Sequence, residues 1–548
     1  MHIIIPMSGM GMRFVNAGYD IPKPLIQIDG KPIIEHVCNL FHESDKFTFI
    51  CNTTHLKTTN MAQILSSIKP NSNIIEINNH KKGPVYAVSK IENLIDDYEE
   101  IIINYCDFGT YWNYDSFLEH TRNRNADGAI PSYKGFHPHM LGSTNYAFIK
   151  ENKQWMTEIK EKEPFTSNRM DEYASNGTYY FKKGAYVKKY FKELIDKDIG
   201  LNGEYYVSLV YNLMKKDSLK ISVYEIQHML QWGTPEDVDE YKKWSKYFNS
   251  AIFNQKLSNK KSKCINLIPL AGMGSRFSIE GYKKPKPLIS ISGKPMVIQA
   301  ANFLPKASKN IFVVLKEHKE KYSVDKIITN HISNSTVISI DKVTQGQALT
   351  CNLGLVNQKL DSQLLISASD NGILYDFEKY KSLTSNPEID VIIFTFRRHV
   401  SSKNKPEMYG WVDVDKDDYA KKVSVKKAIS GDPFNDHAVV GTFWFRKIKY
   451  FKEGLSKLIS KDSRVNNEFY VDSLVNELII LGKSVKVFEV NNYICWGTPN
   501  DYKTFLYWQS YFHKSKFHSY DLKKDNSVNK TEIPVLKSQF FNFNQTYR

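Results

Sequence analysis

The sequence predicts an α/β protein made of two tandem copies of one Rossmann-like domain. Two observations lead to this prediction. The stretch MSGMGMRFVNAGYDIPKPL at residues 7–25 returns as LAGMGSRFSIEGYKKPKPL at residues 270–288. Each half also alternates short β-branched runs with longer amphipathic segments, which is typical of a doubly wound sheet flanked by helices, and we expect this sheet to be mixed but mainly parallel. A repeat of this length is a domain copied whole rather than the unit of a solenoid.

The register of the repeat continues far beyond the motif. Arg13 and Arg276 are 263 positions apart, and so are Asp107 and Asp370. Farther along, every matched pair is 264 positions apart, so one net residue has been gained. We therefore expect both halves to carry the same set of functional positions.

The length sets the domain division. The chain has 548 residues, of which 41% are apolar, and single cores rarely grow beyond roughly 250–300 residues. We expect a first domain over residues 1–250, a polar linker over 251–263, a second domain over 264–515 and a polar C-terminal tail over 516–548.

The elements of the first half alternate from the start of the chain. The strands expected are Ile3–Pro6, Phe47–Asn52, Ile74–Ile77 and Ile101–Tyr105. The helices expected between them are Lys31–Phe41, Thr58–Ile68 and Val85–Leu94. The second half repeats them as Cys264–Pro269, Pro295–Phe303, Ile311–Leu315, Val337–Ile340, Ala348–Leu355 and Leu364–Ala368. The aromatic patterns NGTYYF at 176–181 and VGTFWF at 440–445 follow in the second part of each half.

Charge and cysteine usage exclude several classes of protein. The net charge is +15, but the lysines are dispersed, which indicates a solvated surface rather than a nucleic-acid site. The sequence has no run of about 18 apolar residues, so we expect no membrane span and no stable membrane insertion. It also shows no signal-peptide pattern. The six cysteines form no C-x-x-C pair, which is typical of reduced thiols. We expect a cytoplasmic protein, and a homo-oligomer stays open.

A glycine-rich loop follows the first strand. Glycines at positions 9 and 11 let the backbone approach a phosphate and turn its N–H groups toward it. A dinucleotide-binding loop would need a third glycine where Phe14 stands, and a Walker loop would need Gly-Lys-Ser/Thr. Instead Arg13 follows, and then Lys23 within Pro-Lys-Pro-Leu. Arginine offers a fork for phosphate oxygens and lysine a compact charge.

Asp107 and Asp370 each follow the end of a hydrophobic strand. A carboxylate at the C-terminal tip of a parallel strand lies at the ligand crevice of the sheet. The alternative for each of them is the capping of a helix.

These motifs resemble those of the sugar-phosphate nucleotidyltransferases, also called nucleotide-sugar pyrophosphorylases. The pattern is G-x-G-x-R, then P-K-P-L, then G-K-P at 30–32 and again at 293–295, and the resemblance covers about 1–245 and 264–512. The family has a GT-A-type fold. It joins a nucleoside triphosphate to a sugar 1-phosphate and releases pyrophosphate. For this protein we expect the nucleotide-sugar product to be used in surface polysaccharide synthesis. The partners implied are therefore small molecules and not nucleic acid.

The resemblance also implies a role for each matching residue. The catalytic residues would be Arg13, Lys23, Arg276 and Lys286. The nucleotide would be bound by Ser8, Gly9, Gly11, Gly83, Ala271, Gly272, Gly274, Gln345 and Gly346. The acceptor would be bound by Lys162, Asn176, Gly177, Glu204, Lys426, Gly441 and Glu468. A Mg²⁺ cofactor would be bound by Asp107 and Asp370, since hard cations prefer oxygen ligands.

The sequence departs from the family at several positions. The Glu161-Lys162 pair becomes Val425-Lys426-Lys427 in the second half, and Asn176 becomes Val440. Gln231 and Cys495 stand where many members have a second metal-binding Asp, so a second protein carboxylate on the metal is in doubt.

Three alternatives remain open at this stage. The first is a GT-A glycosyltransferase, because Asp237-Val-Asp239 and Asp413-Val-Asp415 match an Asp-x-Asp motif in letters. The second is a nucleotidyltransferase that acts on a non-sugar phosphate such as a phospho-polyol. The third is a chain in which one half is a non-catalytic binding or regulatory module.

Overall fold

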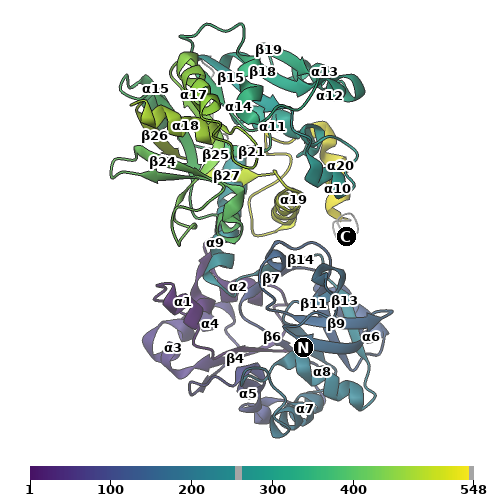
Figure 1. Ribbon diagram of the computed structural model, residues 1–548. Coiled ribbons are helices and arrows are strands. Elements are labelled where there is room, and N and C mark those ends of the chain that lie inside the picture. Colours follow the sequence, from purple (N-terminus) through teal and green to yellow (C-terminus); the bar gives the residue numbers. More distant parts are fainter. Residues whose placement is uncertain (254–261, 542–548) are drawn as a thin grey trace. The chain divides into compact units, whose positions relative to one another are not determined.

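The computed structural model describes residues 1–253 and 262–541, which form two compact units (Figure 1). The first unit comprises residues 1–245 together with 507–519 and 538–541. The second comprises 246–253, 262–506 and 520–537. Most of the expected linker and the last seven residues of the expected tail lie outside the described residues. Within the described part, no helix is both long enough and apolar enough to cross a membrane.

The sheet of the first unit is built around β1 (His2–Met7). Strands β4 (Lys46–Asn52) and β6 (Ile101–Asn104) flank β1 in parallel, and β5 (Asn73–Ile77) continues the sheet beyond β4. The remaining strands of this sheet, in its spatial order after β6, are β12 (Thr178–Phe181), β8 (Gly128–Tyr133), β13 (Ile221–Glu225), β10 (Trp155–Glu161), β9 (Ala147–Asn152) and β11 (Tyr173–Ser175). The short strands are β2 (Gln27–Ile28), β3 (Lys31–Pro32), β7 (Phe108–Tyr111) and β14 (His228–Gln231).

The expected parallel arrangement describes only part of this sheet. Strands β5, β4, β1 and β6 form a parallel block, as the strand–helix alternation predicts. Beyond β6 the pairings of β12, β8, β9, β10 and β11 are antiparallel, and only β8 with β13 is parallel. Each unit is therefore an α/β domain with a large mixed sheet.

The helices of the first unit agree with the expectations in place but are shorter. The expected helix at 58–68 is divided, because Thr59 is extended (φ −136°, ψ 169°) between two helices. The expected helix at 31–41 begins only after Pro32, whose ψ of 147° is extended. The helices are α1 (Met12–Asn16), α2 (Ile33–Cys38), α3 (Thr53–Thr58), α4 (Met61–Ile68), α5 (Gly83–Ser89), α6 (Tyr114–Asn123), α7 (Gly184–Asp196), α8 (Val207–Lys216) and α9 (Pro235–Phe253).

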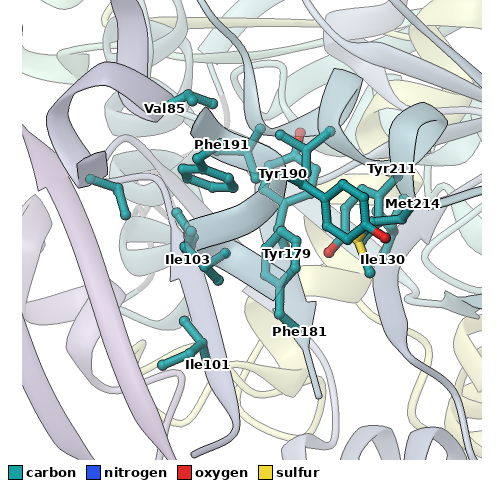
Figure 2. Close-up of a cluster of buried hydrophobic side chains, with 14 of the residues drawn as sticks. Val85, Ile101, Ile103, Ile130, Tyr179, Phe181, Tyr190, Phe191, Tyr211 and Met214 are labelled. Atoms are coloured by element: carbon teal, nitrogen blue, oxygen red, sulfur yellow. The ribbon is translucent and has the colours of Figure 1, made fainter. Parts of the chain in front are cut away.

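Helices α5, α7 and α8 cover one face of this sheet through a single hydrophobic cluster. Figure 2 shows Ile101 and Ile103 of β6 and Tyr179 and Phe181 of β12 together with side chains of the three helices. The ring of Tyr211 stacks on that of Phe181 with centroids 5.1 Å apart. Burial of these side chains, each worth about 1.5–3 kcal/mol for an aliphatic or phenyl group, fixes the helices on the sheet. It also fixes the start of α5, which carries Gly83.

The second unit repeats the parallel block. Strand β15 (Ser262–Leu270) lies between β18 (Ala307–Leu315) and β20 (Leu364–Ile366), and β19 (Ser335–Ile340) pairs with β18. These four strands correspond to β1, β4, β6 and β5. The sheet continues from β20 through β25 (His437–Phe445), β22 (Val391–Phe396) and β26 (Val485–Glu489), and β23 (Gly410–Val414) pairs with β25 and with β24 (Ala420–Val425).

The remaining elements of the second half follow the order of the first. The strands are β16 (Ser290–Ile291), β17 (Lys294–Pro295), β21 (Asn371–Leu374) and β27 (Asn492–Cys495). The helices are α10 (Ser275–Ile279), α11 (Met296–Asn302), α12 (Lys316–Tyr322), α13 (Val324–His331), α14 (Gln347–Gly354), α15 (Phe377–Ser385), α16 (Val400–Asn404), α17 (Ile448–Ser460), α18 (Val471–Ile480), α19 (Pro499–Lys514) and α20 (Ile533–Phe541).

The C-terminal part of α19 groups with the first unit, which differs from the division expected at residues 515 and 516. The hydroxyl of Tyr507 donates to the carbonyl of Met229 at 2.6 Å, and Ser510 is hydrogen-bonded to His228 at 3.1 Å. Tyr507 and Ser510 are buried. The reason is apolar burial: this part of α19, which the expected division assigned to the second domain, carries large aromatic side chains that are buried.

Candidate active site

The glycine loop lies between β1 and α1, at the carboxyl end of the central strand. Gly11 has φ 64° and Gly274 has φ 61°, a left-handed conformation that glycine adopts without strain. A Cβ atom on Gly274 would lie 2.9 Å from the Cβ of Lys286. Glycine is therefore needed there for the loop to pass close to the Pro-Lys-Pro-Leu segment.

The lysine of the Pro-Lys-Pro-Leu segment contacts the aspartate that follows β6, the strand beside β1 in the sheet. Lys23 begins the 3-10 helix η1 (Lys23–Leu25), and its Nζ donates to Oδ2 of Asp107 at 2.8 Å. Burial lowers the pKa of Lys23, but the Asp107 carboxylate outweighs this and the pKa is raised. In the second unit Lys286, at the start of η5 (Lys286–Leu288), makes the same ion pair with Asp370.

A cavity of about 600 Å³ in the first unit brings most of the predicted residues together. Arg13 is exposed and also borders a second cavity, of about 530 Å³, beside Asn145 and the start of α9. The predicted residues that line the larger cavity are Ser8, Gly9, Gly11, Arg13, Lys23, Gly83, Asp107, Lys162 and Glu204. The cavity therefore brings together predicted residues from segments that lie far apart in the chain, and their roles stay a prediction.

One wall of the cavity carries polar side chains that are joined by hydrogen bonds. Lys162 Nζ donates to the hydroxyl of Tyr206 at 2.6 Å, and that hydroxyl donates to the carboxylate of Glu204. Beside them the Glu161 carboxylate accepts a hydrogen bond from Ser208 at 2.6 Å. Burial raises the pKa of Glu161 to about 7. This wall of the cavity offers both a cation and acids to a ligand.

Asn176 and Gly177 are not among the residues that line the cavity. Asn176 is 1% exposed, and its side chain bonds Thr110 Oγ1 at 3.3 Å and the Thr178 N–H at 3.0 Å. A Cβ on Gly177 would lie 3.0 Å from the ring of Phe108. Their geometry is that of a packed turn behind the site, and their role in acceptor binding stays a prediction.

Two other lining residues, His80 and Tyr206, were not identified from the sequence. The Nε2 of His80 lies 2.9 Å from Ser8 Oγ, and its ring meets that of Tyr86 edge to face at 4.9 Å. No motif marks His80, because its partner is 72 residues away. Tyr206 follows Glu204 by two positions, so the helix-start pattern could have identified it.

Gln231 places an amide beside Asp107. Gln231 is the last residue of β14 and pairs with Phe108, the first residue of β7. Phe108 directly follows Asp107 in the chain, and Gln231 lines the cavity. Its Oε1 is buried and has no hydrogen-bond partner in the described part of the chain. Those same residues contain no cluster of three or more His, Cys, Asp or Glu side chains suited to a metal. Asp107 with one neutral oxygen nearby fits a hard cation that takes its other ligands from water and phosphates.

The second unit has the same framework with different details. Gly346 has φ 125°, and its Cβ would lie 2.4 Å from the N atom of Phe469, next to Glu468. Gly83 packs in the same way on Tyr205, next to Glu204. The loop residues Ala271 and Gly272 follow β15, the Gln345 carbonyl accepts from the Phe469 N–H at 2.8 Å, and Gly441 has φ 88°.

Some polar contacts of the second unit differ from those described for the first. Arg276 Nη2 lies 3.6 Å from the sulfur of Met408, and Lys426 Nζ donates to the Met408 carbonyl at 2.6 Å. The thiol of Cys495 donates to Asp501 at 3.4 Å. Burial raises the pKa of Cys495 well above its usual value, so the thiol is not a ready nucleophile.

A glycine loop, an arginine and a lysine–aspartate pair at the carboxyl ends of parallel strands form an arrangement that is chemically suited to phosphate groups. The comparison with protein families agrees for the first unit. Residues 3–200 match the family model described as nucleotidyl transferase.

Comparisons with individual proteins give more distant likenesses. The bifunctional protein GlmU of Buchnera aphidicola is 27% identical over 224 residues, which are 40% of this chain and 46% of that protein. The chain thus spans about half the length of this curated relative. A nucleoside-diphosphate-sugar pyrophosphorylase from Vibrio cholerae has 21% identity and a TM-score of 0.37, covering 44% of this chain and 99% of that one. The inositol-1-phosphate CTP transferase from T. maritima has 18% identity and a TM-score of 0.36, covering 45% and 96%.

Proposed function

We propose that this protein transfers a nucleotidyl group from a nucleoside triphosphate to a sugar 1-phosphate and releases pyrophosphate. The observation that carries the proposal is the ion pair of Lys23 with Asp107 beside the glycine loop, in a segment that matches the nucleotidyl transferase family. The Lys286–Asp370 pair repeats this geometry. It supports a second site of the same class in the second unit.

The reaction proposed is an in-line displacement without a covalent intermediate. An oxygen of the acceptor phosphate attacks the α-phosphorus, and pyrophosphate leaves. Arg13 and the N–H groups of the loop hold the leaving phosphates, and Lys23 neutralises charge at the α-phosphate. Lys162, held by Tyr206, binds the acceptor phosphate. Positioning and charge stabilisation of this kind carry most of the catalysis in phosphoryl-type transfer.

A Mg²⁺ ion fits this arrangement. Asp107 would bind it, and the unpartnered amide oxygen of Gln231 is a second candidate ligand. When bound, the ion supplies neutralisation of the phosphate charges. In the second unit Asp370 would bind it, and the sulfur of Cys495 replaces the amide oxygen.

The Asp-x-Asp alternative finds no support in the geometry. Asp237 lies at the start of α9 and accepts a hydrogen bond from Thr234 Oγ1 at 2.6 Å, which is a helix-capping contact. Asp413 is exposed on β23, and Asp415 caps a turn through the N–H groups of Asp417 and Tyr419. Asp237 does not line the 600 Å³ cavity of the first unit.

The proposal is tested with the full-length protein in a pyrophosphate-release assay. Four nucleoside triphosphates are combined with a panel of sugar 1-phosphates and polyol phosphates, with Mg²⁺ or with excess chelator. We expect release with one sugar 1-phosphate and only in Mg²⁺. Activity confined to a polyol phosphate would replace the acceptor class. Release of a nucleoside diphosphate from a nucleotide-sugar would indicate a glycosyltransferase, and nucleotide binding without turnover a binding module. A nucleotide-sugar product would suit a role in surface polysaccharide synthesis.

A further inference from the structure

The acceptor sides of the two units differ in the place of one acidic side chain. In the first unit the acid is Glu161, at the end of β10, which lines the cavity next to Lys162. The second unit has Val425 at the matching place, at the end of β24. A valine cannot accept a hydrogen bond, so the second site has lost that acid.

The match between the two places rests on the backbone register. Glu161 pairs with Ala147 in the β9–β10 hairpin, and Val425 pairs with Gly410 in the β23–β24 hairpin. The next residue in each case is a lysine with a left-handed backbone, with φ 59° at Lys162 and φ 62° at Lys426. Both lysine N–H groups donate to the carbonyl of the tyrosine directly before the partner strand, Tyr146 at 2.9 Å and Tyr409 at 3.0 Å. The two lysines are therefore structural equivalents.

The second unit has a different acid close to its lysine. Asp472 is the second residue of α18, and the equivalent residue of α8 is Ser208, the hydrogen-bond partner of Glu161. The side chain of Asp472 lies against Gly410: a Cβ on that glycine would be 3.0 Å from Asp472 Oδ2. In the first unit this place belongs to Ala147, which has a Cβ, and the equivalent helix residue is the shorter Ser208.

Three differences thus compensate for one another in space. Where the first unit has Glu161, Ser208 and Ala147, the second has Val425, Asp472 and Gly410. The acid has moved from the strand to the helix, and glycine provides room for it. A role for Asp472 in helix stabilisation alone does not explain this, because an acid in the first turn is favoured as the charged form. Burial instead raises the pKa of Asp472 to about 6, with Lys426 opposing the shift.

We propose that Asp472 replaces Glu161 as the acid that recognises the acceptor in the second site, and that its new place makes the two sites select different acceptors. The inference rests on the proposed function. With the acceptor phosphate on Lys162 or Lys426, a carboxylate nearby accepts a hydrogen bond from a hydroxyl of a polyhydroxylated acceptor. A site built to make such a bond strongly rejects ligands that lack the hydroxyl in that place.

The test exchanges the three residues in full-length protein. Asp107→Asn isolates the second site, and Asp370→Asn isolates the first. On the Asp107→Asn background we compare Asp472→Asn, which keeps the size of the side chain, with the triple exchange Gly410→Ala, Val425→Glu and Asp472→Ser. The reciprocal exchange Ala147→Gly, Glu161→Val and Ser208→Asp is made on the Asp370→Asn background. Each variant is assayed for pyrophosphate release over one acceptor panel.

We expect Asp472→Asn to raise the acceptor KM by at least about tenfold while the nucleotide KM changes less than twofold. Each triple exchange should move the acceptor preference of its site toward that of the other. A purely structural role would instead lower the melting temperature and leave the acceptor preference unchanged, which overturns the inference. If Asp472→Asn does not fold, the triple exchanges decide.

The proposed function can fail separately from this inference. If wild-type protein releases no pyrophosphate with any acceptor, the proposed function is wrong. Calorimetric binding of the same sugar and polyol phosphates to the same variants then decides the inference. An exchanged binding preference supports it, and identical profiles or no binding at all overturn it.

Discussion

Lys23 and Asp107 form an ion pair of 2.8 Å although 84 residues separate them in the chain. Their side chains are 21% and 28% exposed, and the equivalent pair of the second unit is 21% and 26% exposed. Both units therefore hold a lysine and a carboxylate together at the loop where the phosphates are proposed to bind. Part of each side chain faces solvent, so a ligand can reach both charges without unfolding the site.

The first prediction concerns the carboxylate of this pair. Asp107→Asn should keep the packing against Gly233, whose Cβ would lie 3.2 Å from Asp107 Oδ2, while it removes the charge. On an Asp370→Asn background we expect pyrophosphate release by the first site to fall by a further 10²–10³-fold, roughly the effect of removing one preorganised electrostatic group. Nucleotide binding and melting temperature are measured in parallel. A release rate within threefold of the single variant would contradict the assigned role.

The second prediction concerns the arginine of the loop. Arg13 is exposed at the junction of two cavities, so Arg13→Ala should not disturb the core. We expect a loss of roughly 10²–10³ in kcat/KM at the first site, because one donor to the leaving phosphates is gone. Arg276→Ala is the matched variant for the second site. The rates are compared on backgrounds in which the other site is inactive, and Lys150→Ala, an exposed change on β9, serves as the control.

The third prediction uses a difference between the two loops. Ser8 is hydrogen-bonded to His80, and the matching positions in the second half are Ala271 and Val343. The double change Ser8→Ala and His80→Val should raise the nucleotide KM of the first site about 3–10-fold, because one hydrogen bond of about 0.5–1.5 kcal/mol no longer holds the loop. The acceptor KM should not change. A matching rise in acceptor KM would show that His80 acts on the other substrate.

The fourth prediction follows from the raised pKa of Glu161. Its folded pKa is about 7, and its ordinary value is 4.5. The group therefore binds protons more tightly in the folded state, and its contribution to stability is lost as pH rises from 4.5 through 7. Glu161→Gln does not ionise, so relative to wild type it should gain on the order of 3 kcal/mol at pH 8 and little at pH 4. Denaturant unfolding at both pH values measures this, and an equal difference at both would refute it.

The sequence predicted the parts of the site that local motifs determine. The glycine loop, Lys23 and Asp107 are each recognisable within a few residues, and the rule that ligands bind at the carboxyl ends of parallel strands brings them together. The pairing of Ser8 with His80, and of Lys162 with Tyr206, depends on contacts 72 and 44 residues apart. No spacing rule in a single sequence reports such contacts.

The sequence predicted a mixed sheet, but the extent of its antiparallel part escaped prediction for a local reason. Strands β9 and β10 form a hairpin whose turn is Lys153-Gln154, with φ 51° and 61°. Turns with two left-handed residues favour Asn and Gly, so this pair gives no hairpin signal. The antiparallel half of the sheet therefore resembled further strand–helix alternation.

The last prediction concerns the part of α19 that belongs to the first unit. Tyr507 is fully buried, donates to the Met229 carbonyl at 2.6 Å, and packs edge to face on His228 at 4.7 Å. Tyr507→Ala leaves a cavity, and we expect it to destabilise the first unit by about 3–5 kcal/mol, the range for large aromatic truncations. Tyr507→Phe should lose only about 1 kcal/mol, for one hydrogen bond. Ile480→Ala, at a side chain 69% exposed on α18, is the control and should change stability by less than about 0.5 kcal/mol. The readout is heat inactivation of each site, assayed with the other site silenced. Because residues 507–519 group with the first unit, Tyr507→Ala should inactivate the first site at the lower temperature. Earlier loss of the second site alone would mean that α19 stabilises only the half of the chain in which it is encoded.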